Sequence, residues 1–171
     1  WDNNITVASV GARDLPSGTQ PDTILQPQAI IEEDTEMFGT EERFTRTLSN
    51  NAVEYTTPPI QFGWYLDLVS PVHGKQGERV IADPVVTVSE GNSPLIVFNT
   101  FAPTGGCETA GGFSALMALD PINGGRTNFA VFDLNGDDAF TADDADSSGA
   151  HDSGLITGST IAPVALISST D

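Results

Sequence analysis

Acidic and amide side chains recur at every second position in one stretch of the sequence. Asp133, Asn135 and Asp137 are separated by single residues, and Asp144 closes the stretch. Short carboxylate and amide side chains at this spacing let a tight loop point three oxygens at one centre. Hard oxygen donors without histidine or cysteine favour calcium over zinc or copper. Residues 133–144 therefore predict a calcium-binding loop; the alternative is an acidic, solvated turn that binds no ion.

Each ligand position of an EF-hand loop has a candidate in this stretch. For positions 1, 3, 5, 7, 9 and 12 the candidates are Asp133, Asn135, Asp137, Ala139, Thr141 and Asp144. Ala139 would bind through its backbone carbonyl, Thr141 through a bridging water, and Asp144 as a bidentate carboxylate. Asp138 stands where a calmodulin-type loop has glycine, and Asp144 replaces glutamate, as in dockerin-type loops. We therefore expect an affinity of roughly 10⁻⁴ to 10⁻⁶ M, which suits the extracellular space.

No amphipathic helix pattern follows the loop, because Ser147, Ser148 and Gly149 intervene. A calcium loop without a helix pair is expected to be structural, since a sensor needs two helices that can open a groove.

The chain as a whole is strongly acidic. Its 171 residues include 24 Asp and Glu against 6 Lys and Arg, which gives a formal charge of −18. Seven of the acids fall between Asp133 and Asp152. Two explanations of this charge stay open: solubility of the whole chain, or a cation bound among the clustered acids. Such a chain repels phosphate backbones, which excludes nucleic acid as a partner, and it contains no apolar run long enough to span a membrane.

The elements that must hold the loop are predicted to be short β-strands. With 17 Gly and 11 Pro the chain is rich in turns. Strand-like alternation or apolar runs occur at residues 5–10, 29–31, 44–48, 53–55, 62–68, 79–82, 113–120, 129–132 and 161–167. Residues 85–88 and 95–101, joined by a short polar turn, predict a hairpin. The acidic residues 32–42 lack a sustained period and could hold a helical turn.

The spacing of these strands favours one architecture. Short strands at intervals of roughly ten residues fit a sandwich, a barrel or a propeller, and a recurrence over roughly 40 to 50 residues matches one four-stranded blade. The expected fold class is all-β: part of a modified β-propeller of about three to four blades, with a dockerin- or EF-hand-like calcium loop. Residues 1–171 form one propeller fragment in this interpretation, with loop 133–144 inserted between strands. Its open sheet edges would recruit further strands.

Catalytic signals are weak. His151, Asp152 and Ser153 are neighbours in sequence, but neighbours seldom reach triad geometry, and the chain lacks a nucleophile elbow. His73 lies in a loop context of its own, so we expect no enzyme. Cys107 is the single cysteine, which leaves a free side chain or a pairing outside this sequence.

Several further stretches match the pattern of a known family. They are residues 1–3 (WDN), 63–68 (GWYLDL), 77–80 (GERV), 97–103 (VFNTFAP), Cys107, 116–120 (LMALD), 124–126 (GGR) and 131–137 (VFDLNGD). Together they resemble the C-terminal propeller of the PilY family, the tip-associated adhesins and assembly factors of type IV pili. The resemblance covers most of the chain and is strongest between residues 62 and 137.

The resemblance implies a seven-bladed, modified propeller, export to the outer membrane or pilus tip, and calcium-regulated pilus retraction. Asp133, Asn135, Asp137 and Ala139 match the family's loop, whereas Thr141 stands where the family places an acid. The expected function is that of a calcium-binding, non-enzymatic extracellular fragment of a type IV pilus tip adhesin and assembly factor, acting in pilus biogenesis and surface attachment. The alternative is a self-assembling extracellular filament or structural subunit. The expected partners are minor pilus subunits, or further copies of the chain through open strand edges.

Overall fold

The structure, a computed structural model, describes residues 25–38, 40–57, 61–89, 92–103 and 111–157. The strands predicted at residues 5–10 and 161–167, and Cys107, lie outside the described residues. Within the described part, every regular element is a strand except one short 3₁₀ helix, which confirms the all-β prediction. No helix in that part is long and apolar enough to cross a membrane.

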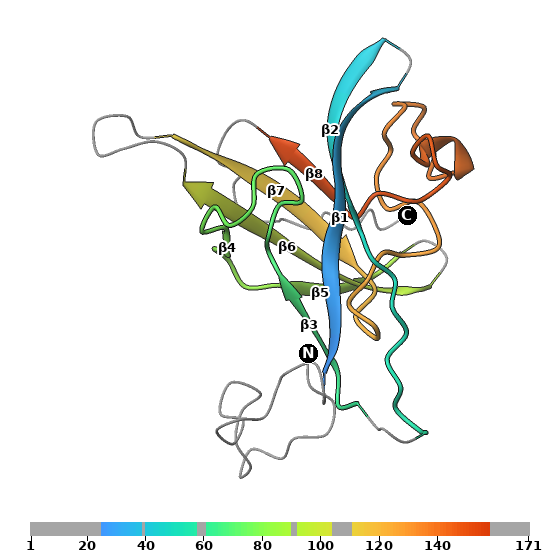
Figure 1. Cartoon of the computed structure of the whole chain (residues 1–171). Coiled ribbons are helices and arrows are strands. Elements are labelled where there is room, and N and C mark those ends of the chain that lie inside the picture. Colours follow the sequence, from blue (N-terminus) through green and yellow to red (C-terminus); the bar gives the residue numbers. More distant parts are fainter. Residues whose placement is uncertain (1–24, 39, 58–60, 90–91, 104–110, 158–171) are drawn as a thin grey trace.

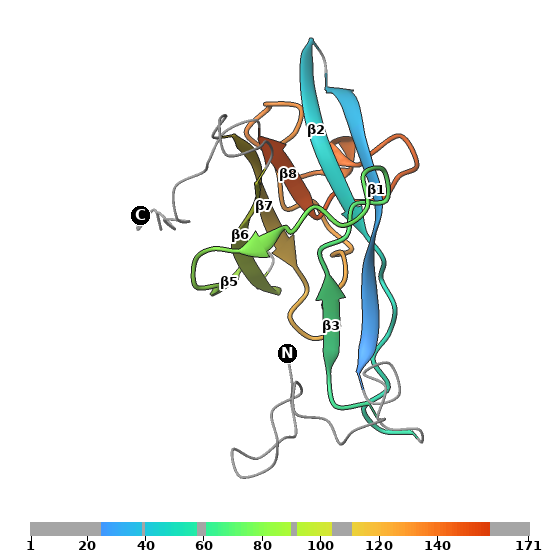
Figure 2. The ribbon, with the colours of Figure 1, turned by 60° about the vertical axis from the view of Figure 1, so that its left-hand side comes forward.

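Eight strands form one curled sheet (Figures 1 and 2). They are β1 (Gln26–Phe38), β2 (Glu41–Leu48), β3 (Trp64–Asp67), β4 (Arg79–Val80), β5 (Val85–Val88), β6 (Pro94–Pro103), β7 (Gly112–Leu119) and β8 (Gly154–Thr157). The order is β3-β1-β2-β8-β7-β6-β4, and β5 also pairs with β6. All pairings are antiparallel except that of β1 with β3. The fold is propeller-like, as predicted, although the described strands follow one path in place of separate four-stranded blades.

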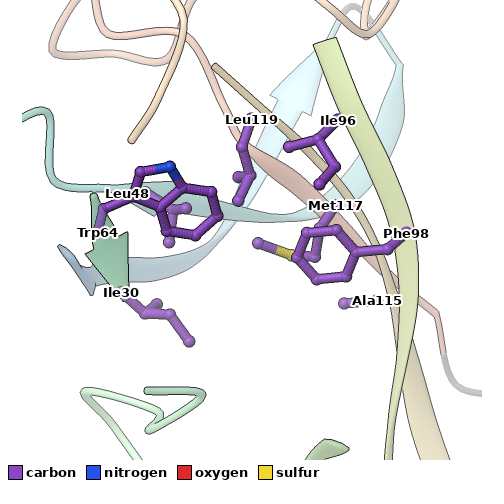
Figure 3. Close-up of a cluster of buried hydrophobic side chains, with 8 residues drawn as sticks. All are labelled: Ile30, Leu48, Trp64, Ile96, Phe98, Ala115, Met117 and Leu119. Atoms are coloured by element: carbon purple, nitrogen blue, oxygen red, sulfur yellow. The ribbon is translucent and has the colours of Figure 1, made fainter. Parts of the chain in front are cut away.

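The main core lies inside the curl of the sheet (Figure 3). Its buried members are Ile30, Leu48, Trp64, Ile96, Phe98, Ala115, Met117 and Leu119. The first three come from β1, β2 and β3, and the others from β6 and β7. Strands β3, β1 and β2 therefore face β6 and β7 across one apolar cluster, and burial of this cluster stabilises the curled sheet.

The opposite face of β6 and β7 carries a second, smaller cluster. Leu95, Val97 and Ala118 are buried there, and Phe129 and Val131 pack against them. Residues 129–132 form no strand, so the strand predicted at that position is wrong. Their continuous apolar run arises because this coil covers the sheet, and a buried coil produces the same run as a buried strand.

The long hairpin of β1 and β2 is the largest departure from the sequence-based expectation. The acidic residues 32–42, where a helical turn was considered, belong to this hairpin, and Phe38 pairs with Glu41 across the turn. Opposite charges face each other across the ladder, with Glu33 beside Arg46 and Glu36 beside Arg43. Such cross-strand pairs stabilise a strand whose outer part has no buried apolar side chain among the described residues.

Other predicted strands fare differently. The hairpin of β5 and β6 is confirmed, with Val86 opposite Ile96 in the ladder. Residues 62–68 contain the shorter strand β3, and residues 53–55 form no strand. Val53 nevertheless packs against the main core, and Tyr55 donates a 2.6 Å hydrogen bond to the carbonyl of Ile122, so this segment is held by its side chains.

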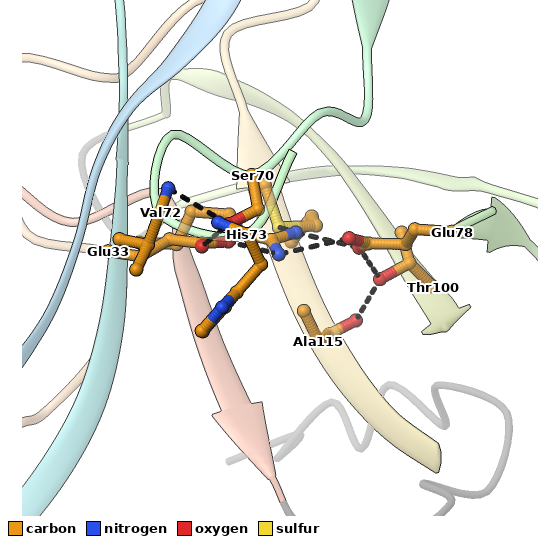
Figure 4. Close-up of polar contacts among 9 residues, drawn as sticks. Glu33, Ser70, Val72, His73, Glu78, Thr100 and Ala115 are labelled. Atoms are coloured by element: carbon orange, nitrogen blue, oxygen red, sulfur yellow. Dashed lines mark hydrogen bonds and ion pairs between the residues drawn. The ribbon is translucent and has the colours of Figure 1, made fainter. Parts of the chain in front are cut away.

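A buried polar cluster joins the hairpin to the rest of the sheet (Figure 4). Arg46 on β2 contacts Glu33 on β1 at 2.6 Å and Glu78, just before β4, at 2.7 Å. Ser70 donates to Glu33, and Thr100 on β6 donates to Glu78. Burial alone would lower the pKa of Arg46, but the bonds and charges of Glu78 and Glu33 outweigh it and raise that pKa.

Candidate metal centre

The predicted calcium loop lies in the long coil between β7 and β8. Its first residues follow the coil that covers the second core cluster, and Leu134 is itself buried. The loop ends in the 3₁₀ helix η2 (Ala142–Asp144), from which the chain runs to β8 (Gly154–Thr157). Because β8 lies between β2 and β7 in the sheet, the loop leads into a central strand.

Asp133 organises the first half of the loop. Its Oδ1 accepts hydrogen bonds from the backbone N–H of Gly136 at 2.7 Å and of Asp137 at 3.2 Å. Its Oδ2 accepts from the N–H of Asp138 at 3.0 Å. One carboxylate thus folds three consecutive peptide groups around itself, which is how a short aspartate stabilises a tight turn.

Asn135 and Asp137 form the next turns of the same loop. The side-chain oxygen of Asn135 accepts from the N–H of Asp137 at 2.9 Å, and Asp137 Oδ1 accepts from the N–H of Ala139 at 2.9 Å. The Asn135 amide also donates to Asp137 Oδ2 at 3.3 Å. Hydrogen bonds therefore link each of these predicted ligands to the next one along the loop.

Asp138 replaces the expected glycine without loss of the loop conformation. Its φ of 62° lies in the left-handed region, as does the φ of 75° at Gly136. Aspartate and asparagine adopt this region more readily than most other side chains. The departure from the calmodulin-type pattern therefore leaves the turn in place.

Asp144 ties the two ends of the loop together and is only 1% exposed. Its Oδ1 accepts from the N–H groups of Leu134 at 2.8 Å and Asn135 at 3.2 Å. Its Oδ2 accepts from the N–H of Thr141 at 3.0 Å, while the Thr141 hydroxyl accepts from Asp143 and caps η2. The loop is thus closed by its last predicted ligand.

The donor atoms of the loop are of the kind that binds a hard divalent cation, but their side chains lie too far apart to hold one in this structure. Carboxylate, amide and carbonyl oxygens are the donors that calcium prefers. Among the described residues, however, no three His, Cys, Asp or Glu side chains are grouped as a metal site. Each carboxylate is engaged with backbone N–H groups and keeps lone pairs free, so binding would require the carboxylates to draw closer together.

The neighbours His151, Asp152 and Ser153 do not form a catalytic relay. Asp152 Oδ1 accepts a hydrogen bond from the Thr47 hydroxyl at 2.9 Å, and the Ser153 hydroxyl accepts from the N–H of Leu48 at 3.3 Å. His151 Nδ1 is buried and has no hydrogen-bond partner among the described residues. The histidine–aspartate bond that orients a catalytic base is therefore missing.

Asp146 and Asp152, which follow the predicted loop, are buried, and the sequence pattern does not indicate this. Asp146 is 8% exposed and Asp152 is 3% exposed. Burial raises the pKa of Asp152 to about 6, and the charges of Asp146 and Glu36 add to that effect, while the hydroxyls of Thr47 and Thr45 oppose it. Nothing in a run of acidic loop residues distinguishes buried carboxylates from solvated ones, so only their alternating spacing could have singled them out.

Known proteins resemble parts of this chain. No family model matches the chain. The type IV pilus biogenesis factor PilY1 homolog of Xylella fastidiosa is 40% identical over 76 residues, which are 43% of this chain and 6% of that protein. Type IV pilus biogenesis factor PilY1 of Pseudomonas aeruginosa is 32% identical over 114 residues, or 64% of this chain and 9% of that protein.

A solved structure of a PilY1 domain also resembles this chain in fold. The crystal structure of the Pseudomonas aeruginosa PilY1 C-terminal domain matches with a TM-score of 0.65 and 25% identity, covering 78% of this chain and 26% of that chain. The chain therefore spans less than a tenth of the length of these two curated relatives and about a quarter of the solved domain.

Proposed function

We propose that this chain, a relative of the PilY1 C-terminal domain, acts in type IV pilus biogenesis as a non-enzymatic, surface-exposed module. The observation that carries this proposal is the agreement of two comparisons. Relatives named as pilus biogenesis factors align by sequence, and the PilY1 domain aligns by fold over 78% of the chain. Fold alone would not carry a function, but sequence identity at 32% to 40% adds to it.

The proposed location is the outer-membrane surface or the extracellular pilus tip, in contact with minor pilus subunits. The charge of −18 keeps such a module soluble, and an all-oxygen calcium loop of modest affinity would be filled outside a cell. Adhesion through this surface is part of the proposal.

Calcium is the proposed ligand of the loop at residues 133–144. Asp133, Asn135, Asp137 and Asp144 would supply side-chain oxygens, Ala139 its carbonyl, and Thr141 a water contact. Support comes from the turns around Asp133 and from the buried closure at Asp144. A bound ion would fix the coil that leads into β8, and so would stabilise the centre of the sheet.

Deleting the gene for this chain in its host tests the pilus role. We expect surface pili, measured as sheared pilin by immunoblot and by electron microscopy, to be lost while pilin is still present inside the cell. The wild-type gene should restore piliation. Normal piliation in the deletion strain would overturn the proposal.

Self-assembly is a second candidate function, favoured by the free edge of β5. Among the described residues β5 pairs only with β6, and its Val86 and Val88 are 58% and 59% exposed. An exposed apolar edge strand pairs readily with another, so the proposed occupant is β5 of a second copy. Light scattering of the purified chain should then give a dimer or larger mass, lost when Val86 and Val88 are both replaced by lysine. Val72→Lys, which changes an exposed valine outside β5, is the control, and a wild-type monomer contradicts the idea.

A further inference from the structure

A second loop of alternating oxygen donors follows directly after the first. Asp146, Ser148 and Asp152 lie in a small hairpin that is closed by a bridge between Ala145 and His151. The N–H of Asp146 donates to Ala150 at 2.8 Å, and the N–H of Gly149 donates back to Asp146 at 2.9 Å. The loop is thus a defined turn next to β8, separate from the turns around Asp133.

Two buried carboxylates in this hairpin are only half satisfied. Asp146 Oδ1 accepts from the N–H of Ser148 at 2.8 Å, from its hydroxyl at 2.6 Å, and from the N–H of Ala150 at 2.8 Å. Asp152 Oδ1 accepts from Thr47 at 2.9 Å. The Oδ2 atoms of both aspartates are buried and have no hydrogen-bond partner among the described residues. Buried carboxylate oxygens without partners are costly, so each needs an explanation.

A third carboxylate approaches the same place from the hairpin of β1 and β2. Glu36 Oε1 lies 3.4 Å from the N–H and 3.5 Å from the hydroxyl of Ser147, and its charge acts on Asp152 together with that of Asp146. On β2, Arg43 stands opposite Glu36, whereas Arg46 is engaged with Glu33 and Glu78. Three negative groups from two distant parts of the chain therefore lie near one partly buried place. As they stand they are not grouped closely enough to hold an ion, so binding would draw the three carboxylates together, as in the first loop.

We propose that Asp146, Asp152 and Glu36 bind a second divalent cation, calcium, between this hairpin and β1. The two free Oδ2 atoms are the primary ligands, and Glu36 adds a carboxylate from outside the hairpin. Oxygen donors of this kind select a hard cation. The carboxylates of this site are not ligands of the first loop, although Asp144, the last ligand of that loop, precedes Asp146 by only two residues.

The spacing of the residues supports the same assignment. Counted from Asp144, the residues Asp146, Ser148, Ala150 and Asp152 occupy positions 3, 5, 7 and 9 of an EF-hand loop. Gly149 takes position 6 with a φ of 81°, the left-handed conformation that this position requires. Position 12 is Leu155, which cannot act as a ligand, and Glu36 takes over that role from β1. A buried water would satisfy the same oxygens but would leave their charges uncompensated.

Calorimetric titration of the whole chain with CaCl₂ after chelator treatment tests the site by counting bound ions. We expect two equivalents for the wild type. The double variant Asp146→Asn/Asp152→Asn should lose one, Asp133→Asn/Asp137→Asn should lose the other, and Asp138→Asn, which neutralises an aspartate assigned to neither site, should keep both. Circular dichroism checks that each variant is folded.

The outcomes separate the two sites. A folded Asp146→Asn/Asp152→Asn variant that binds as many ions as the wild type overturns the second site and leaves the first intact. The second site is also overturned if the wild type binds only one calcium ion and that ion is lost only in the Asp133→Asn/Asp137→Asn variant. If the double variant does not fold, Glu36→Gln decides instead, since it leaves the hairpin unchanged. Glu36→Gln should lower the affinity for one of the two calcium ions by about tenfold. If both affinities are unchanged, the proposal is overturned.

Discussion

Arg46 and Glu78 meet in a two-point ion pair in the interior of the sheet. Nη1 of Arg46 lies 2.7 Å from Oε1 of Glu78, and Nη2 lies 3.0 Å from Oε2. The two side chains are 0% and 1% exposed. β2 and the segment before β4 are not neighbours in the strand order, so this pair links two separate parts of the curled sheet, in addition to the apolar core.

Removing one charge of this pair should destabilise the chain strongly. In Glu78→Gln the buried guanidinium keeps only Glu33 as an anionic partner. We expect the free energy of unfolding, measured in urea, to fall by about 3 kcal/mol or more. Glu32→Gln changes the same charge at an exposed position and should stay within about 0.5 kcal/mol. Equal effects of the two substitutions would contradict a buried role for the pair.

Gly124 should not tolerate a side chain. Its φ is 74°, and a Cβ there would come within 1.9 Å of the Trp64 ring. Gly77 has a similar φ of 71° with nothing within 4 Å, so Gly77→Ala isolates the backbone strain. We expect Gly77→Ala to cost about 1 kcal/mol and Gly124→Ala to cost about 1–3 kcal/mol more, by thermal unfolding. Similar losses for both would mean that Trp64 moves aside freely.

Calcium should stabilise the folded chain through the loop at residues 133–144. For a dissociation constant of roughly 10⁻⁴ M, about 10 mM calcium adds about 2.7 kcal/mol. That gain corresponds to a rise in Tm of about 5–10 °C for a chain of this size. Asp133→Asn/Asp137→Asn should reduce the rise, whereas Asp138→Asn should not. A Tm that is the same in calcium and in chelator would rule out the ion as a structural element.

Asp152 should make stability depend on pH when divalent ions are removed. Its folded pKa is about 6, above the usual value of 3.8, because it is buried and close to Asp146 and Glu36. The folded state therefore binds more protons between about pH 4 and 6, and the stability falls as the pH rises through that window. In chelator, Asp152→Asn should be more stable than the wild type at pH 7.5, and this advantage should disappear near pH 4.

Urea unfolding at several pH values measures this effect. Asp143→Asn removes an exposed charge from the same coil and serves as the control. A difference between wild type and Asp152→Asn that does not change with pH would argue against the raised pKa.

The sequence predicts those strands whose burial is one-sided or continuous. Val86 and Ile96 lie in the hairpin that alternation and a polar turn indicated, and the buried Trp64 begins β3 within the strand predicted at residues 62–68. The turns of the metal loop also follow from local chemistry, because Asp133 folds the chain through its own neighbours. Local rules work where the contacts are local.

The rest depends on contacts between distant residues. The apolar run at residues 29–31 indicated the inner part of β1, but its outer part carries no apolar pattern, because Glu32 and Asp34 are exposed and the nearly buried Glu33 is held by Arg46. Arg46 sits in an alternating strand, yet its burial depends on Glu33 and on Glu78 from far along the chain. Asp152 is buried because Thr47 of β2 lies against it. Such partners become neighbours only once the sheet has curled.

The position of β8 has a consequence for how the chain folds. This strand is the last one described, yet it lies between β2 and β7, in the middle of the sheet. During synthesis from the N-terminus, both neighbours must wait with unpaired edges until it arrives, and closing such non-local pairs is slow. A ribosome-bound chain that stops short of residue 154 therefore has a sheet with a gap at its centre, and the described sheet is complete only after β8 emerges.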